Sequence, residues 1–252
     1  MTTIAEIYKY IDIFAPFESA EEWDNVGVLV GDINKNVTRV LLALDITNEV
    51  LDEAMRLSAQ LVISHHPIIF QPIKRLPAES PVYKAASHGI TCLCAHTNLD
   101  KSREHGVNTA LAAAAGLLNF RQSDEGHILF LGDTDKTITA AEFALRLKIG
   151  LSAGGLVYTN SCNEIHRVGL CSGGGGSEIY AAAKAGCDAF ITGEIKHHEL
   201  MFANESKIST FVLGHFTSEN VVLEPLKVLL KDEFPEVEFF KSAVLNDQTK
   251  YM

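Results

Sequence analysis

The sequence has no apolar stretch that approaches the roughly 20 residues a membrane-spanning helix needs. Its first residues show no basic region followed by an apolar one, so we expect no signal peptide. Positive charge is also scarce, since 21 lysines and arginines stand against 32 acidic residues, for a formal net charge of -11. Binding to nucleic acids depends on lysine and arginine neutralising phosphates, so a nucleic acid is not expected as the main partner. A small anionic substrate stays open, because bound divalent cations would reverse the local charge of a pocket.

Cysteines are few, and their spacing favours neither disulfides nor a thiolate metal site. The sequence has five of them, an odd number, and no two have the C-x-x-C spacing. Most lie inside apolar runs, which is typical of small buried thiols in a reducing compartment. We therefore expect a cytoplasmic protein with free thiols, and these are Cys92, Cys94, Cys162, Cys171 and Cys187.

What the sequence does have is a regular alternation of short apolar runs and amphipathic segments. Ile4, Ile7 and Ile11 recur at helical spacing, and Pro16 ends that first predicted helix. Strands are predicted at 26–30, 39–44, 61–64 and 91–95, and further helices at 48–59, from 81 onward, at 107–115 and after the capping-box pattern at 139–142. Strands that alternate with helices predict a largely parallel sheet covered on both faces, which is a layered α/β/α fold.

The second half of the sequence repeats the first. The matches are 39–42 with 167–170, 62–64 with 190–192 at the same shift and, at a slightly smaller shift, His96 with His215 and Asp100 with Glu219. Apolar matches alone carry little weight, but polar residues recur at both strand ends. We therefore predict an α/β fold of two intertwined halves, approximately 1–125 and 126–252, related by a pseudo-two-fold axis. No Gly, Ser or Pro linker separates them, so we expect the halves to be interlocked rather than hinged.

Imidazoles and carboxylates follow three of the predicted strands. They lie in the segments Ser64-His65-His66-Pro67, His96 to Asp100, and His215 to Glu219. Parallel α/β sheets bind ligands beyond the carboxyl ends of their strands, so the three segments can meet in one cleft. Pro67 ends the strand before it, which allows two adjacent histidines to serve one site. A single histidine at a strand end is most often an ordinary surface or core residue, but three such segments favour a metal site.

The ligand count predicts a two-metal site formed by His65, His66, Asp100, His215 and Glu219, with His96 nearby. Mixed nitrogen and oxygen ligands suit zinc, manganese, iron or nickel. Paired ions in proteins lie about 3.5–4 Å apart, lower the pKa of a bound water and hold the group under attack. The sequence therefore favours a metal-dependent hydrolase.

Three further segments have two interpretations each. The glycine-rich segment Gly173–Gly176 can bind a phosphate through backbone N–H groups or can be a tight turn that packs a helix against the sheet. Glu194 and His198 can support the metal ligands or move protons, and equally can belong to a solvated helix start. The segment Gln71–Pro81, with Lys74 and Arg75, can be a lid or an exposed loop.

Several motifs together resemble one family over almost the whole chain. They are Trp23-Asp24-Asn25-Val26-Gly27, Ser64-His65-His66-Pro67 with Phe70, His96-Thr97-Asn98-Leu99-Asp100, Gly106-Val107-Asn108, Thr192-Gly193-Glu194, and Gly214-His215 with Glu219. In these the chain resembles the GTP cyclohydrolase 1 type 2 homologues, or Nif-three-like proteins. The resemblance implies a dinuclear metal site carried by the same five residues, with His96 close by but not assigned as a ligand. It also implies a homohexamer, a trimer of dimers, and a single unit over 1–252 without the middle domain of longer relatives.

The resemblance and the residues lead to one expected function and two alternatives. We expect a dinuclear metal-dependent hydrolase that acts on a nucleotide-like substrate, with GTP cyclohydrolase-like ring opening by metal-activated water. His96, Glu194 and His198 are the candidates for moving protons. A metal-dependent phosphoesterase is the alternative within the hydrolases. A non-catalytic metal-handling or regulatory protein is the alternative outside them.

Overall fold

The chain folds into two compact units. The computed structural model describes residues 1–125, 128–162 and 164–250. Unit 1 contains Met1–His105 and Leu223–Asn246, and unit 2 contains Gly106–Val222 with the residues from Asp247 onward. The chain therefore leaves unit 1 after His105, returns to it at Leu223 and enters unit 2 again at Asp247. The predicted halves 1–125 and 126–252 describe the repeat in the sequence, whereas the two units describe which residues pack together. The halves therefore stay a prediction.

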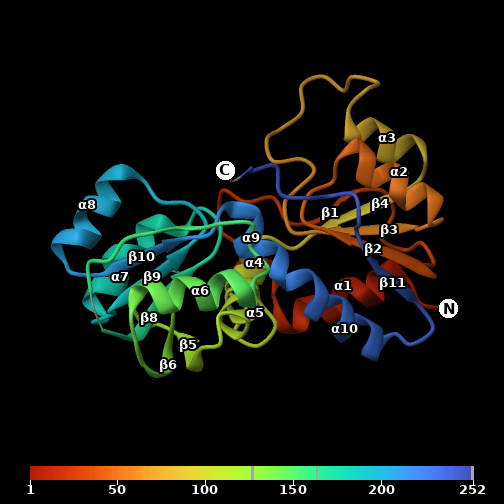
Figure 1. Ribbon diagram of the computed structural model, residues 1–252. Coiled ribbons are helices and arrows are strands. Elements are labelled where there is room, and N and C mark those ends of the chain that lie inside the picture. Colours follow the sequence, from red (N-terminus) through yellow and green to blue (C-terminus); the bar gives the residue numbers. More distant parts are fainter. Residues whose placement is uncertain (126–127, 163, 251–252) are drawn as a thin grey trace. The chain divides into compact units, whose positions relative to one another are not determined.

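Unit 1 is built on a five-stranded sheet with the order β1-β4-β3-β2-β11 (Figure 1). The parallel strands β2, β3 and β4 are its centre; β11 is parallel to β2, and β1 is antiparallel to β4. Every residue of β3 and β4 is buried, as expected for parallel strands covered on both faces. The bounds are β1 Gly27–Val30, β2 Arg39–Ala43, β3 Leu61–Ser64, β4 Thr91–Cys94 and β11 Glu238–Lys241.

Three helices of unit 1, those that begin at Ile4, Asn48 and Pro81, begin where the sequence predicts. The N-cap Ser80 accepts a hydrogen bond from the Tyr83 N–H at 3.2 Å, and proline takes the first helical position. Helices α2 and α3 pack on one face of the sheet, against Leu41, Ala43 and Val62. The bounds are α1 Ile4–Phe14, the 3-10 turn η1 Phe17–Ser19, α2 Asn48–Arg56, α3 Pro81–Ser87, α4 Thr97–Asp100 and α10 Leu223–Glu233.

Unit 2 is built on a six-stranded sheet with the order β5-β6-β8-β9-β10-β7. The strands β8, β9 and β10 are parallel, and the other pairings are antiparallel. The strand bounds are β5 Leu118–Gln122, β6 Phe130–Ile138, β7 Val157–Tyr158, β8 Ile165–Cys171, β9 Ala189–Thr192 and β10 Ser209–Val212. The helix bounds are α5 Val107–Ala114, α6 Ala140–Gly150, η2 Gly175–Glu178, α7 Ile179–Lys184, α8 His197–Glu205, α9 His215–Glu219 and η3 Asn220–Val222.

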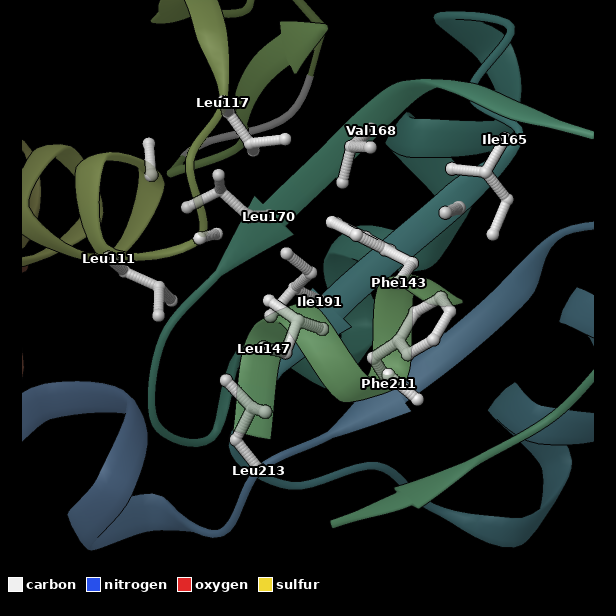
Figure 2. Packing of buried hydrophobic residues seen from close by; sticks show 14 of the residues in the cluster. Leu111, Leu117, Phe143, Leu147, Ile165, Val168, Leu170, Ile191, Phe211 and Leu213 are labelled. Atoms are coloured by element: carbon white, nitrogen blue, oxygen red, sulfur yellow. The ribbon is translucent and has the colours of Figure 1, made fainter. Parts of the chain in front are cut away.

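Helices cover both faces of the unit 2 sheet, which confirms the α/β/α layering there. Helices α5 and α6 pack against one face, where Phe143 meets Phe211 edge-on with ring centroids 5.0 Å apart (Figure 2). Helices α7 and α8 pack against the other face, around Phe190 and Leu131. The capping box predicted for α6 is present, since Thr139 and Glu142 bond to each other's backbone N–H. The mixed α/β fold class is therefore confirmed.

The repeat in the sequence is also present in the two sheets. Val40 pairs with Leu61 in unit 1 and Val168 pairs with Ala189 in unit 2, so β2–β3 and β8–β9 share one register. In each sheet the third parallel strand, β4 or β10, also pairs with an antiparallel strand, β1 or β7. The two units therefore contain the same four-stranded arrangement.

One match within the repeat is wrong by one residue. The N–H of Ala95 bonds to Ser64 O, and the N–H of Leu213 bonds to Thr192 O, so Ala95 corresponds to Leu213. By the same register His96 corresponds to the next residue, Gly214, and not to His215. The hydrogen-bond ladder fixes which residues are equivalent, whereas the sequence match followed the spacing between histidine and carboxylate.

Candidate functional site

Unit 1 gathers three histidines at the carboxyl ends of β3 and β4. His65 and His66 follow β3 directly, and His96 is the N-cap of α4 just after β4. Their ring nitrogens that can bind a metal all lie within 4.8 Å of one another. The centroids of their rings are 5.1 to 5.5 Å apart. We call these three residues the histidine cluster.

Each imidazole of the cluster is oriented by an oxygen at Nδ1. His65 Nδ1 lies 3.0 Å from the carbonyl oxygen of Ala95, and because a carbonyl only accepts, Nδ1 carries the proton. His66 Nδ1 lies 2.8 Å from Asp45 Oδ1, and His96 Nδ1 lies 2.9 Å from Asp24 Oδ1. A proton on Nδ1 leaves the lone pair on Nε2, which is the arrangement found in metal-bound histidines.

Asp24 is held by hydrogen bonds to both of its carboxylate oxygens. Its Oδ2 accepts hydrogen bonds from the Thr97 N–H at 3.1 Å and the Thr97 hydroxyl at 2.5 Å, and its Oδ1 faces His96. Burial by itself would raise the pKa of Asp24, but the hydrogen bonds from His96 and Thr97 outweigh it and hold that pKa well below its usual value. Asp24 therefore stays ionised and keeps the His96 ring in place.

Asp100 completes the group in unit 1. It is the last residue of α4, it is buried, and its Oδ1 lies 3.6 Å from His65 Nε2. Burial of a carboxylate beside an imidazole is costly unless charges are paired or a cation is bound. The predicted residues His65, His66, His96 and Asp100 are thus brought together in unit 1.

Unit 2 brings together His215 and Glu219, as the sequence predicts, on one face of the short helix α9. His215 Nε2 lies 3.2 Å from Glu219 Oε2, one helical turn along. On the other side of the ring, His215 Nδ1 lies 3.0 Å from Glu194 Oε1. Glu194 lies two residues beyond β9, and its predicted role in supporting a metal ligand stays a prediction. We call His215 and Glu219 the α9 pair.

The first glycine of the glycine-rich segment leaves space for the α9 pair. Gly173 has a φ of +55°, and a Cβ at this position would overlap the Glu219 carboxylate and come within 3.3 Å of His215 Nε2. The segment continues into the 3-10 turn η2, which leads into α7. These contacts favour the tight-turn interpretation of Gly173–Gly176, and phosphate binding there stays a prediction.

The other candidate residues, His198 and the segment Gln71–Pro81, keep the alternatives that the sequence left open. His198 is exposed in the first turn of α8, and its proposed proton transfer stays a prediction. The segment before α3 contains no helix or strand, and both Lys74 and Arg75 are exposed. The choice between a lid and an exposed loop at Gln71–Pro81 therefore stays open. The dinuclear set of five ligands draws on both units and likewise stays a prediction.

Sequence reasoning missed Asp24 and Asp45 as the residues that orient the histidines. A signal for Asp45 was available, since this acidic residue follows β2, the strand beside the one that precedes His65. Asp24 lies in the motif Trp23 to Gly27, but no local pattern indicated its role, because it precedes β1 and reaches His96 only through the fold.

The donor set of these residues fits a divalent metal ion. Unit 1 offers three imidazoles with oriented rings and one buried carboxylate, and unit 2 offers an imidazole and a buried carboxylate. Such mixed nitrogen and oxygen donors select zinc, iron, manganese or nickel rather than magnesium or calcium. Within the described ranges, no helix is long and apolar enough to cross a membrane.

Comparison with known proteins identifies relatives over nearly the full length. The model of the Duf34/NIF3 (NGG1p interacting factor 3) family matches residues 2–248. A Clostridium perfringens protein named GTP cyclohydrolase 1 type 2 homolog is 30% identical over 259 positions, which cover 98% of each chain. A Campylobacter jejuni protein of the same name is 31% identical over 239 positions, covering 91% of this chain and 92% of the relative.

A solved structure shares the fold. The crystal structure of the Staphylococcus aureus hypothetical protein SA1388 superimposes with a TM-score of 0.92 at 29% sequence identity, and 99% of each chain is covered.

Proposed function

The chain belongs to the Duf34/NIF3 family, and we propose that it binds two divalent metal ions and hydrolyses a nucleotide-like substrate with them. The observation that carries this proposal is the orientation of the four imidazoles. Each has an oxygen at Nδ1, from Ala95, Asp45, Asp24 or Glu194, which makes Nε2 the nitrogen that would face a metal. An ordinary surface histidine has no need of such orientation.

The proposed ligands are His65, His66, Asp100, His215 and Glu219. Three imidazoles and two carboxylates supply enough donors for two ions, and a carboxylate can bridge them. Both carboxylates are buried, which is costly without a nearby cation. Under this proposal the histidine cluster and the α9 pair serve the same dinuclear centre.

Bound together, two such ions would lower the pKa of a water molecule and polarise the group it attacks. The chain's own residues would orient the ligands and move protons. Glu194 is an exposed carboxylate beside His215 and is a candidate proton acceptor. His96, held by Asp24, and His198 are the other candidates for proton transfer.

The substrate class follows from the names of the relatives. They are called GTP cyclohydrolase 1 type 2 homologs, and opening the imidazole ring of a purine requires water to add at C8. We extend that chemistry to this chain as part of the proposal. A homohexamer, a trimer of dimers, and a cytoplasmic location also remain part of it. Light scattering would test the assembly, which should have six times the 27.5 kDa mass of one chain.

A metal-handling protein without turnover is the second candidate function. The observation that favours it is the exposure of two proposed ligands, since the side chains of His66 and His215 are 22% and 38% exposed. Ligands open to solvent allow metal ions to exchange. Rapid exchange of metal without hydrolysis of any nucleotide in a broad panel would favour this function over the hydrolase.

The test is metal content followed by activity. Elemental analysis of the purified protein should find about two divalent ions per chain, the count that the five ligands imply. His65→Ala should lose most of that metal and all hydrolysis of nucleotides. His88→Ala, which removes an exposed histidine of the same unit, is the matched control and should retain both. Equal metal content in wild type and His65→Ala would contradict the proposal.

A further inference from the structure

Two large aromatic side chains of unit 1 are exposed beside the histidine cluster. Trp23 is 58% exposed and Phe70 is 47% exposed. Their ring centroids lie 5.9 Å apart with the planes tilted by 45°. The same two rings lie 6.1 Å and 6.4 Å from the His96 ring. Exposed indole and phenyl rings are unfavourable in water, so their grouping at this place requires an explanation.

Hydrogen bonds fix the backbone that carries both rings. Asp24, the residue after Trp23, bonds to His96 and Thr97. The Asn25 side chain donates to Ile69 O at 2.6 Å, and Ile69 precedes Phe70. The two aromatic rings are therefore attached to the same hydrogen-bond network that orients His96, and their positions relative to the histidines are defined.

The chemistry of this pair suits a flat aromatic ligand. Aromatic side chains bind nucleobases through their faces, whatever the base, because every base has a π-face. Positive charge follows on the same segment, since Lys74 and Arg75 are exposed four and five residues beyond Phe70. A nucleotide combines a planar ring with phosphate, which are the two features that this surface would recognise.

We propose that Trp23 and Phe70 form a stacking surface for the purine ring of a nucleotide, beside His96. This inference rests on the proposed function, because it places the ring of the substrate next to the metal ligands of unit 1. It goes beyond that function by naming the two residues that bind the ring. Neither residue is a proposed metal ligand, so binding of the base can be tested separately from binding of the metal.

The experiment uses the fluorescence of Trp23, which is the one tryptophan of the whole sequence. Purified full-length protein is titrated with guanosine 5′-monophosphate, excited at the red edge of indole absorption and corrected for absorption by the nucleotide. Ribose 5-phosphate, which lacks the base, is titrated in parallel. Saturable quenching by the nucleotide and none by ribose 5-phosphate is the expected result.

Two variants make the test specific to the aromatic pair. Phe70→Ala should weaken the nucleotide's apparent affinity about tenfold, a typical loss for one stacking contact. Phe120→Ala, which removes a partly exposed phenylalanine of unit 2, should leave it unchanged. The inference fails if quenching is absent, if ribose 5-phosphate quenches equally, or if the two variants behave alike.

Two further outcomes distinguish the stacking surface from a contact between copies of the chain and from the metal site. If Trp23 emission shifts with protein concentration alone and not with nucleotide, the aromatic pair is a contact between copies and the inference is overturned. If His65→Ala loses its metal while no variant or ligand changes Trp23 emission, the proposed metal site is supported. The same result contradicts the proposed stacking surface.

Discussion

At the scale of single residues, the proposed function depends on how carboxylates orient histidines. His66 faces Asp45, His96 faces Asp24 and His215 faces Glu194, each through Nδ1. None of these carboxylates is itself a proposed ligand. Substitution of one of these carboxylates should therefore change metal affinity without removing a metal–ligand bond. Such variants measure the effect of orienting a ligand apart from the effect of losing one.

The first prediction concerns Asp45. Asp45→Asn should weaken metal binding about 10- to 100-fold, because an amide orients the His66 ring less firmly and lowers its basicity. Competition with a chelator of known affinity measures the change. Asp52→Asn removes a carboxylate that pairs with Lys84 on the surface of the same unit and should have no effect. Identical affinities for the two variants would show that Asp45 does not orient a ligand.

The second prediction concerns Gly173. Gly173→Ala should destabilise the protein by at least about 1 kcal/mol, because φ is +55° and the added methyl group overlaps Glu219. It should also reduce metal content by displacing the carboxylate. The neighbouring Gly174→Ala is the control, since a Cβ there meets no atom within 4 Å and its φ is -78°. Urea unfolding of both variants and elemental analysis provide the comparison; a stable, metal-replete Gly173→Ala protein would refute the argument.

At the scale of elements, helix α6 shows how amphipathic spacing fixes the layers of unit 2. Phe143 and Leu147 are fully buried against β10 and its neighbours (Figure 2). Leu145, on the other side of the helix, is 59% exposed. Residues three and four positions apart share a helix face, so the sequence alone indicates which side packs on the sheet. The strength of that packing depends on Phe211, which lies far along the chain.

The third prediction tests this packing. Phe143→Ala should lower the free energy of unfolding by about 3–5 kcal/mol, the usual loss when a fully buried phenylalanine leaves a cavity. Leu145→Ala, two residues along the same helix, should change it by less than about 0.5 kcal/mol. Chemical denaturation followed by circular dichroism measures both. Similar values for the two variants would mean that α6 does not pack as described.

At the scale of the whole molecule, unit 1 is completed by a segment far from its other residues. Strand β11 pairs with β2, with Phe239 opposite Val40. The two residues that follow β11 donate hydrogen bonds to the buried carboxylate of Glu53 in α2. The donors are the Ser242 hydroxyl, at 2.6 Å, and the Ala243 N–H, at 3.0 Å. Without this segment the edge of β2 would be open and Glu53 would be buried without these donors.

The fourth prediction follows from that return of the chain. A fragment of residues 1–105 should lack a cooperative unfolding transition and should aggregate through the open β2 edge. The same fragment joined to residues 223–246 by a flexible Gly/Ser linker should fold, because the linker restores β11 and the donors to Glu53. Thermal unfolding followed by circular dichroism distinguishes the two. Cooperative unfolding of residues 1–105 alone would show that β11 is dispensable.

The sequence by itself determined the local structure and the types of residue that we propose as metal ligands. Helical spacing predicted α1, the Ser80-Pro81 pair predicted the start of α3, and the apolar run 61–64 is β3 with the same bounds. These features depend on neighbouring residues and on the periodicity of burial, so a single sequence contains them. The histidines and acidic residues at the strand ends could also be found from the sequence, because they directly follow the apolar runs that form the strands.

Only the tertiary structure decided which residues orient the histidines and how the repeat aligns. Asp24 reaches His96 across 72 positions of the sequence, and the ladder moved the equivalent of His96 to Gly214. Only the tertiary structure shows that residues 223–246 pack in unit 1 with residues 1–105. Such contacts depend on strand order and register, which hydrogen bonds and packing between distant segments select, and local sequence patterns carry no record of them.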